Sequence, residues 1–329
     1  MTSTSTVLIL GASGRLGAAC TTAFADAGWQ VMAQTRKLAV QKLPDGVYPL
    51  VTGDLPSNRS TAKLQNVDVV VHAMNPAYTN PAWIAHVPAM MKSAIDIAQS
   101  LRATLIFPGN VYNFGADMPD TLDESTPYRP TTVKGKLRVD AELALERATQ
   151  VSVLRAIVIR AGDFFGYGSG SMFDRVIVSK IRKGTFTHAG PIDVRTPWAY
   201  LPDLAQTFVR VAERRRQLAA FEVLHFAGHA ANGHDWLRAL QPLATANGWL
   251  TDWQALKTAA LPWPVMRVMA VFSPELASLV EMRYLQSTPH ALDNTRLRKL
   301  IGAEPHTPLG QATANSLTRL GWIQHPNHY

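Results

Sequence analysis

Short apolar runs alternate with segments of helical periodicity through the first two thirds of the chain. Continuous apolar runs are typical of strands buried on both faces of a parallel sheet, and helical segments between them are typical of crossover connections. We therefore expect an α/β fold built on a doubly wound parallel sheet. The predicted strands lie at residues 6–10, 29–33, 47–51, 67–73, 103–107 and 151–159, and the main predicted helices at 16–27, 81–102 and 132–149.

The first predicted strand leads directly into a glycine-rich turn, Gly11-Ala-Ser-Gly14-Arg-Leu-Gly17, which opens the first predicted helix. Such a turn lets the backbone approach a pyrophosphate and directs the N-terminal amides of the helix toward it. The strand before the turn and the helix after it make the signal specific. The sequence therefore predicts a Rossmann-type dinucleotide site with contacts from Gly11, Ser13, Gly14, Arg15, Leu16 and Gly17.

The pattern becomes less regular in the second half of the chain. Residues 171–183 and 202–217 have helical periodicity, and residues 221–226 resemble a short strand. The rest contains most of the tryptophans and many prolines. We predict a dinucleotide-binding Rossmann domain over residues 1–165. A smaller, mainly helical substrate-binding lobe is predicted over residues 166–329, interleaved with returns to the sheet.

The composition is that of an ordinary globular enzyme, with 47% apolar and 17% charged residues. A net charge of +8 would suit a nucleic-acid partner, but the basic residues are scattered along the chain. The densest run, Arg214-Arg215-Arg216, falls at the predicted end of a helix, where it complements the helix dipole. We therefore expect a small-molecule substrate and no nucleic-acid partner.

Cys20 is the single cysteine, so no intrachain disulfide can form, and its place on the apolar face of the first helix favours packing over reactivity. The first strand begins too close to Met1 for a signal peptide to precede it. The most apolar late stretch, residues 261–272, is too short to span a bilayer and contains Arg267. We expect a cytoplasmic protein without membrane contact, and leave open whether it forms a homodimer.

Further motifs extend the pattern beyond the glycine turn. They are Gly53-Asp54-Leu55, Val71-His72-Ala73, the run from Arg160 to Gly166, and Trp198-Ala-Tyr-Leu-Pro-Asp203. Together these motifs resemble the extended short-chain dehydrogenase/reductase family, which contains nucleotide-sugar epimerases and dehydratases. The resemblance covers nearly the whole chain and is strongest over the first two thirds. It implies cofactor contacts from Asp54, Leu55, Ala73 and Asn75.

The resemblance also implies a catalytic set that this chain carries only in part. Family members normally have a serine or threonine after the fifth strand and a YxxxK motif on the next helix. Alignment places Asn110 at the hydroxyl position, Thr132 at the tyrosine position and Lys136 at the lysine position. A threonine hydroxyl has far too high a pKa to replace a phenolate, and Tyr112 is the nearest replacement phenol. Asn110 can still donate to a carbonyl oxygen, and Lys136 can hold the nicotinamide ribose.

The resemblance implies an acid at the end of the second strand in NAD-dependent members. Here Thr35 occupies that position, and the basic residues Arg36 and Lys37 follow it. An acid would repel a 2′-phosphate, whereas an arginine fork binds one. We therefore favour NADP over NAD as the cofactor, with Arg36 at the 2′-phosphate and Arg15 as a further phosphate contact.

Four residues are candidates for substrate contact. Asp163 occupies a turn position that meets substrate in family relatives, and for Phe165, two residues later, packing is an equal alternative. Arg195 and Trp198 lie in a stretch suited to a substrate lid. We expect no metal, because three histidines of the second half lack a convincing ligand geometry and a carboxylate partner: His225, His229 and His234.

These expectations converge on an NADP-dependent oxidoreductase that transfers a hydride to or from a small or medium carbonyl or alcohol substrate. Two alternatives stay open. A nucleotide-sugar epimerase or dehydratase fits the resemblance but is weakened by the missing tyrosine. A non-catalytic NADP-binding sensor shares the cofactor motifs and accounts for Thr132 directly, and only turnover separates it from an enzyme.

Overall fold

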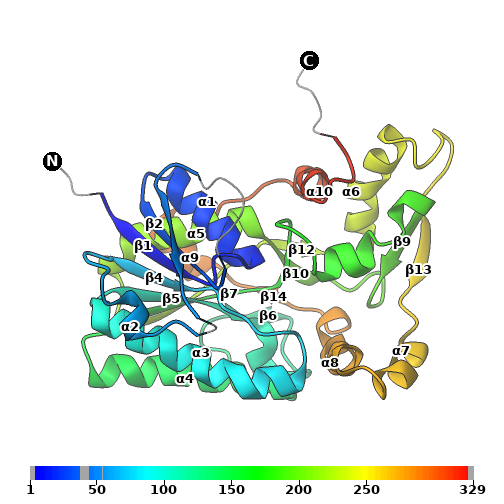
Figure 1. Cartoon of the computed structure of the whole chain (residues 1–329). Coiled ribbons are helices and arrows are strands. Elements are labelled where there is room, and N and C mark those ends of the chain that lie inside the picture. The colour runs from blue at the N-terminus through cyan, green and yellow to red at the C-terminus, as the bar shows by residue number, and fades with distance from the viewer. Residues whose placement is uncertain (1–3, 38–43, 54, 325–329) are drawn as a thin grey trace.

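A seven-stranded sheet forms the centre of the molecule (Figure 1). The computed structural model describes residues 4–37, 44–53 and 55–324. The sheet strands are β1 (Thr6–Leu10), β2 (Gln30–Thr35), β3 (Val47–Val51), β4 (Val69–His72), β5 (Thr104–Asn110), β7 (Arg155–Ala161) and β11 (Phe221–His225). Their order is β11-β7-β5-β4-β1-β2-β3, and every neighbouring pair is parallel. The doubly wound, Rossmann-type α/β fold expected from the apolar runs is confirmed.

Helices cover both faces of the sheet, as Figure 1 shows. One face carries α1 (Arg15–Asp26), α5 (Leu201–Arg214) and α9 (Thr295–Ile301), and the other carries α2 (Asn58–Thr61), α3 (Asn80–Leu101) and α4 (Val133–Val151). The first layer packs around Phe24 and Phe208, with the thiol of Cys20 buried as expected, and the second around Met91 and Leu145. No helix among the described residues is both long and apolar enough to cross a membrane.

The remaining elements build a smaller lobe beside the carboxyl ends of the sheet strands (Figure 1). A three-stranded sheet has β10 (Thr196–Tyr200) between β8 (Asp163–Phe165) and β12 (His229–Ala231). Two strand pairs join β9 (Thr185–His188) to β13 (Lys257–Ala260) and β6 (Thr121–Leu122) to β14 (Ala291–Leu292). The helices of the lobe are α6 (Gly233–Ala246), α7 (Trp263–Ala270), α8 (Pro274–Glu281) and α10 (Leu309–Arg319).

The two halves of the chain are interleaved. After β10 the chain returns to the sheet, because α5 packs against α1 and β11 pairs with β7. The lobe has its own hydrophobic cluster. In it the ring centroid of Phe165 lies 5.4 Å from that of Tyr200 and 5.3 Å from that of Trp236. The division of the chain at residue 165 stays a prediction.

Residues 171–183 do not form the single helix that their periodicity predicts. They form one π-helical turn at Phe173–Ile177 and a 3-10 turn at Ile181–Lys183. The consecutive side chains of Val176, Ile177 and Val178 are all buried. A regular helix cannot direct three successive side chains toward one core, so packing overrides helix propensity in this segment.

The strand predicted at residues 151–159 begins later than expected. Helix α4 continues to Val151, and β7 starts at Arg155. Val151 and Val153 are 84% and 81% exposed. Their β-branched side chains suggested a strand, but they occupy the solvent-exposed connection between the two elements.

Candidate active site

The glycine turn connects β1 to α1. Gly11 has a φ of +83°, and a Cβ at this position would lie 2.8 Å from the backbone nitrogen of Met74. A Cβ on Gly17 would lie 2.2 Å from the carbonyl oxygen of Gly11. The fold itself therefore requires glycine at both positions. Gly14 differs, because it is exposed and its Cβ would meet only the Gly11 oxygen, at 3.3 Å, and the Ala73 oxygen, at 3.9 Å.

The exposed backbone at Ser13 and Gly14, followed by the start of α1, suits a dinucleotide pyrophosphate. Helix α1 starts directly after Gly14, and no side chain of the described residues caps it. Its first backbone amides are therefore available to an anion, with the helix dipole favouring negative charge. Ser13 is exposed in this turn, whereas the side chain of Leu16 is buried in the core. The turn thus provides the cradle that the sequence predicts.

Gln34 holds the glycine turn against the sheet, a role that the sequence analysis missed. The backbone N–H of Gly11 donates to Gln34 Oε1 at 2.8 Å. Gln34 Nε2 in turn donates to Thr52 Oγ1 at 2.7 Å. The only available signal is a polar residue at a buried position of β2, since Gln34 is 2% exposed.

The residues expected to bind the adenosine end lie after β2 and β3. Arg36 is exposed directly after β2, and Leu55 is exposed after β3. Asp54 lies outside the described residues. Arg15 does not join this group, because its Nη1 donates to the carbonyl oxygen of Phe164 at 3.3 Å. Its guanidinium thus reaches toward β8, and the further phosphate contact expected from Arg15 stays a prediction.

The residues after β4 lie at the same edge of the sheet. His72 is buried beside the Phe107 ring, with ring centroids 5.3 Å apart, and burial together with the charge of Arg138 lowers its pKa to about 3. His72 is therefore neutral at physiological pH. Ala73 is partly exposed, and the exposed Asn75 accepts a hydrogen bond from Arg138 Nη2 at 3.4 Å. Arg138 thus brings positive charge to the position beside Asn75.

Helix α4 directs Lys134 and Arg138 inward and Lys136 outward. Lys134 is fully buried and Lys136 is exposed. The guanidinium of Arg138 lies 5.0 Å from the Trp83 ring centroid. Residues four apart share a helix face, whereas a residue between them points elsewhere. The structure therefore does not bring Lys136 to the site, and the pair that faces it, Lys134 and Arg138, was missed from the sequence.

Two residues expected to act in catalysis serve as helix caps. Thr132 is the N-cap of α4, and its Oγ1 accepts the Gly135 N–H at 3.1 Å. Asn110 caps the short 3-10 helix that follows β5, and its Oδ1 accepts the Tyr112 N–H at 3.1 Å. The N-cap role explains why a threonine occupies position 132, since threonine is a favoured N-cap residue. The Asn110 side chain keeps its Nδ2 group as a donor, since the cap uses only the oxygen.

A pair of phenols lies next to these caps. The hydroxyl groups of Tyr78 and Tyr112 are 3.2 Å apart. Burial raises the pKa of Tyr112 to about 12, and the nearby charge of Asp163 adds to this effect. Burial also raises the pKa of Tyr78 well above its ordinary value. Both phenols are therefore protonated near neutral pH and act as hydrogen-bond donors.

Asp163 completes what we call the phenol–carboxylate cluster: Tyr78, Tyr112, Asp163 and Gln286. Gln286 Nε2 donates to Asp163 Oδ2 at 2.5 Å. Burial raises the pKa of Asp163 to about 6, an effect that the Gln286 hydrogen bond and the charge of Arg15 partly offset. A carboxyl group with such a pKa exchanges protons near neutral pH.

A further polar network connects the end of α8 to the starts of α3 and α4 beside the site. Lys134 Nζ donates to Asn80 Oδ1 at 2.5 Å, and Asn80 Nδ2 donates to Glu281 Oε2 at 2.7 Å. Glu281 Oε1 also accepts the backbone N–H of Val133 at 3.0 Å. Burial lowers the pKa of Lys134 to about 8, although the charge of Glu281 opposes the shift. Glu281 therefore fixes the starts of both α3 and α4.

A buried ion pair anchors the loop before α4 to the sheet. Arg160 Nη2 and Glu142 Oε2 are 2.6 Å apart, and both side chains are 1% exposed. Tyr128 donates to Glu142 Oε2 at 2.9 Å and also contacts Arg160. The phenol of Tyr128 thus belongs to this anchor and not to the phenol–carboxylate cluster.

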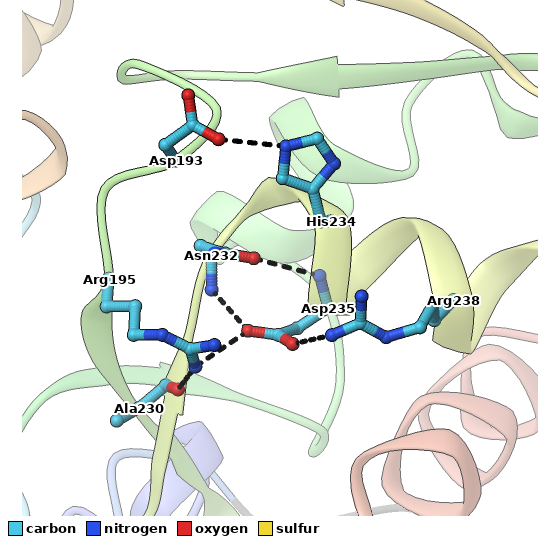
Figure 2. A network of polar contacts seen from close by, with 7 residues as sticks. All are labelled: Asp193, Arg195, Ala230, Asn232, His234, Asp235 and Arg238. Atoms are coloured by element: carbon cyan, nitrogen blue, oxygen red, sulfur yellow. Dashed lines mark hydrogen bonds and ion pairs between the residues drawn. The ribbon is translucent and has the colours of Figure 1, made fainter.

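Three of the expected substrate residues lie elsewhere. Phe165 is fully buried in the lobe core, and Trp198 is 2% exposed with its ring 5.3 Å from Trp236. Both residues pack the interior, because the small sheet and α6 meet there. Arg195 donates to the Ala230 carbonyl oxygen at 2.8 Å and faces a different cleft (Figure 2). Of the four, the structure places only Asp163 at the site.

Comparison with known proteins identifies the family. The model of the NAD dependent epimerase/dehydratase family matches residues 7–227. This segment contains the glycine turn, the six strands of the central sheet that follow it and the phenol–carboxylate residues Tyr78, Tyr112 and Asp163. The chain belongs to the NAD-dependent epimerase/dehydratase family. As expected from the motifs, it resembles the extended short-chain dehydrogenase/reductase type.

A curated relative of this epimerase/dehydratase family member is dTDP-6-deoxy-L-talose 4-dehydrogenase (NAD(P)(+)) from Kitasatospora kifunensis. The two are 25% identical over 171 residues, which are 49% of this chain and 53% of the relative. The match thus spans about half the length of the curated relative.

Solved epimerase structures share the fold. A UDP-galactose 4-epimerase is 16% identical, with a TM-score of 0.71 over 96% of this chain and 98% of that one. UDP-glucuronic acid 4-epimerase from Bacillus cereus, in complex with UDP-glucuronic acid and NAD, is 13% identical, with a TM-score of 0.72 over 95% and 98%. At these identities the likeness supports the fold alone.

This epimerase/dehydratase family member has Thr132 at the tyrosine position of YxxxK, and the lysine at the second position, Lys136, is exposed. Lys134 and Arg138 have the spacing of the motif and face the site, whereas Thr132 caps the helix and Lys136 is exposed. The basic groups that face the site are therefore those of Lys134 and Arg138, which lie two residues after the aligned positions, Thr132 and Lys136. The phenol that lies at the site comes from Tyr112 instead.

Proposed function

We propose that this chain is an NAD(P)-dependent oxidoreductase that transfers a hydride to or from a carbonyl or secondary alcohol of a nucleotide sugar. One observation carries the proposal: the dinucleotide cradle and the phenol–carboxylate cluster meet at one edge of the sheet. Arg15 joins the two, because it belongs to the glycine turn and its charge acts on both Asp163 and Tyr112. A cofactor and a substrate held by these groups would share that edge.

The substrate class is supported by the family and by the relatives. The curated relative is named for a dTDP-sugar, and the two epimerases are named for UDP-sugars. These names favour a nucleotide sugar over the small or medium carbonyl compound expected from the sequence. The replacement of the family tyrosine by Thr132 does not remove acid–base chemistry, because Tyr112 and Asp163 remain at the site.

The chain's own residues have distinct roles in the proposed reaction. The nicotinamide, when bound, supplies or accepts the hydride. Tyr112 exchanges a proton with the substrate oxygen, and its protonated phenol suits the donor role in reduction. Asn110 Nδ2 is a second donor toward that oxygen. Arg138 takes the ribose-positioning role that the sequence suggested for Lys136, and Asp163 takes up or releases the proton.

Arg36 supports NADP as the preferred cofactor. It is exposed at the end of β2, where a guanidinium can pair with a 2′-phosphate. Replacing Arg36 by alanine should lower NADPH affinity by about 10- to 100-fold and leave NADH affinity unchanged. Fluorescence titration of both cofactors measures this, with Arg59→Ala on α2 as the exposed control. An unchanged ratio of the NADPH and NADH affinities would contradict the role of Arg36 in NADP preference, but it would not contradict the oxidoreductase proposal.

Turnover tests the proposal itself. The protein is mixed with NAD⁺ or NADP⁺ and a panel of UDP- and dTDP-hexoses, and formation of the reduced cofactor is followed by absorbance. We expect turnover that falls by roughly 10²–10⁴ in Tyr112→Phe, with cofactor affinity retained. Tyr48→Phe, on an exposed part of β3, is the matched control and should behave as wild type.

Each outcome separates the candidate functions. Cofactor binding without turnover across the panel would contradict the enzyme and favour the NADP-binding sensor. Turnover that persists in Tyr112→Phe would move the proton-transfer role to Lys134 or Asp163 and leave the hydride transfer intact. Conversion of a hexose to its epimer without net cofactor reduction would assign the epimerase reaction.

A further inference from the structure

A second cleft lies in the lobe between β12, α6 and the start of α10. Its volume is about 510 Å³, which is within the range of small-molecule sites. No member of the phenol–carboxylate cluster lines it. We refer to it as the lobe cleft, and its polar residues are Arg195, His229, Asp235, Arg238 and His306.

Two arginines of the lobe cleft are held in place by one carboxylate (Figure 2). Arg195 Nη1 lies 2.9 Å from Asp235 Oδ2, and Arg238 pairs with Oδ1 of the same residue. Asp235 is itself fixed by a capping box with Asn232, since each backbone N–H donates to the other's side chain at 3.0 Å. A second pair, His234 with Asp193 at 2.9 Å, secures the loop before Arg195.

This arrangement leaves positive charge facing the cleft. Two guanidinium groups share one carboxylate, so the three side chains carry a net charge of +1. The side chains of Arg195 and Arg238 remain 56% and 70% exposed, and each guanidinium has further N–H donors. Donors that are already oriented lose little conformational entropy when an anion binds.

His229 provides an independent indication of a ligand. It lines the lobe cleft, is 7% exposed, and its Nε2 has no hydrogen-bond partner among the described residues. Its ring centroid lies 4.5 Å from that of His306, which also lines the cleft. Buried polar atoms are nearly always paired in native proteins, so an unpaired one at a cleft wall points to a missing partner.

The start of α10 completes the wall. The helix has eleven residues and begins after Pro308, with no side-chain cap from the described residues. Leu309 and Gly310, its first two residues, line the lobe cleft. Unpaired N-terminal amides and the helix dipole favour an anion at this position.

We propose that the lobe cleft is a second ligand site, which binds a small molecule carrying a phosphate monoester group. Arginine forks and an uncapped helix N-terminus together match the several oxygens of a phosphate better than the two of a carboxylate. The site is separate from the dinucleotide cradle, and the proposal does not depend on the proposed function.

Gly310 allows a test that leaves the fold intact. A Cβ on Gly310 would have no heavy atom within 4 Å, so a larger side chain fits there. Gly310→Asp places a negative charge in the lobe cleft and also suits a helix N-terminus, so the variant should fold. Gly310→Asn has nearly the same size without the charge and is the matched control.

Binding is measured on the full chain by titration with inorganic phosphate and with glycerol phosphate. The backbone amide signals of His306, Thr307 and Leu309 report on the lobe cleft, so phosphate at the glycine turn gives a separate signal. We expect saturable binding that is at least tenfold weaker in Gly310→Asp and in Arg238→Gln, and unchanged in Gly310→Asn. Acetate should bind more weakly than either phosphate.

Three results would overturn the proposal. The first is the absence of saturable shifts at His306, Thr307 and Leu309 in the wild type with both phosphates. The second is equal affinity of the wild type and Gly310→Asp. The third is acetate binding as tightly as glycerol phosphate, which would assign a carboxylate site. Loss of turnover is not among the readouts, so failure here and failure of the oxidoreductase proposal are distinguishable.

Discussion

Burial sets the protonation of individual residues at the active-site edge. It raises the pKa of Asp163 to about 6 and lowers that of Lys134 to about 8. Both shifts favour the neutral form of the side chain. The charge of the site therefore changes on either side of neutral pH, which suits a reaction that takes up or releases a proton with each hydride.

Replacing Asp163 by asparagine should reveal this shift as a change in stability. The pKa of Asp163 is higher in the folded protein than its ordinary value of 3.8, so the wild type loses stability as pH rises from about 4 to 6. The unfolding free energy of Asp163→Asn should not fall in this way, because asparagine does not ionise. It should match the wild type near pH 4 and exceed its unfolding free energy by about 1–3 kcal/mol above pH 7.

Denaturant unfolding at the two pH values measures the difference. The exposed variant Asp252→Asn is the control and should show no pH-dependent gain. A constant difference between Asp163→Asn and wild type across this pH range would contradict the raised pKa of Asp163.

At the scale of elements, the rotation of α4 decides which basic groups reach the site. The helix begins after Thr132, so Lys134, Arg138 and Glu142 fall on one face at intervals of four residues. Lys136 lies outside this stripe. The function of the helix therefore depends on its phase, which the cap at Thr132 and the buried pair of Glu142 and Arg160 determine together.

The two lysines of α4 should respond differently to replacement by methionine. Lys134 carries a desolvated ammonium below pH 8, so Lys134→Met should raise the unfolding free energy at pH 7 by about 1–3 kcal/mol and lower turnover. The gain should shrink as pH rises toward 10, because the wild-type amine then becomes neutral. Lys136→Met should change neither stability nor turnover. If Lys136→Met alone reduced turnover, the orientation of α4 described here would be wrong.

The glycine turn offers a second contrast within one element. Gly14→Val should abolish dinucleotide binding while the protein stays folded, because only the Gly11 and Ala73 oxygens lie near the added Cβ. Gly17→Val should unfold the protein or lower its melting temperature strongly, because its Cβ would meet the Gly11 oxygen at 2.2 Å. Circular dichroism and cofactor titration separate the two effects. Retained nucleotide affinity in a folded Gly14→Val would show that the turn is structural only.

At the scale of the whole molecule, the sequence predicts the sheet well and the site only in part. Parallel strands are continuous apolar runs, and the glycine turn carries a local pattern, so both are visible in one short window. Gln34, Tyr78 and Gln286 have no such pattern, because their roles arise from contacts between distant segments. The prediction of a single helix over residues 171–183 is wrong for the same reason, since packing on the lobe core decides the conformation of this segment.

The Glu142–Arg160 pair should be central to the stability of the whole molecule, because it joins a helix layer to the central sheet. Glu142→Gln leaves the Arg160 guanidinium buried without a countercharge and should lower the unfolding free energy by about 3–5 kcal/mol. The double variant Glu142→Leu/Arg160→Met removes both charges and should be less destabilised than the single variant. Denaturant unfolding measures both, and equal losses would mean that packing and not charge sets the effect.

The Glu281 carboxylate has a consequence for how the protein is made. It fixes the starts of α3 and α4, yet it is residue 281 of 329, far along the chain from Asn80 and Val133. During synthesis the first strands can pair while these helix starts still lack their carboxylate. A ribosome-bound chain can therefore pair its first strands early, but the candidate active site is completed only after Glu281 has been made and has reached Asn80 and Val133.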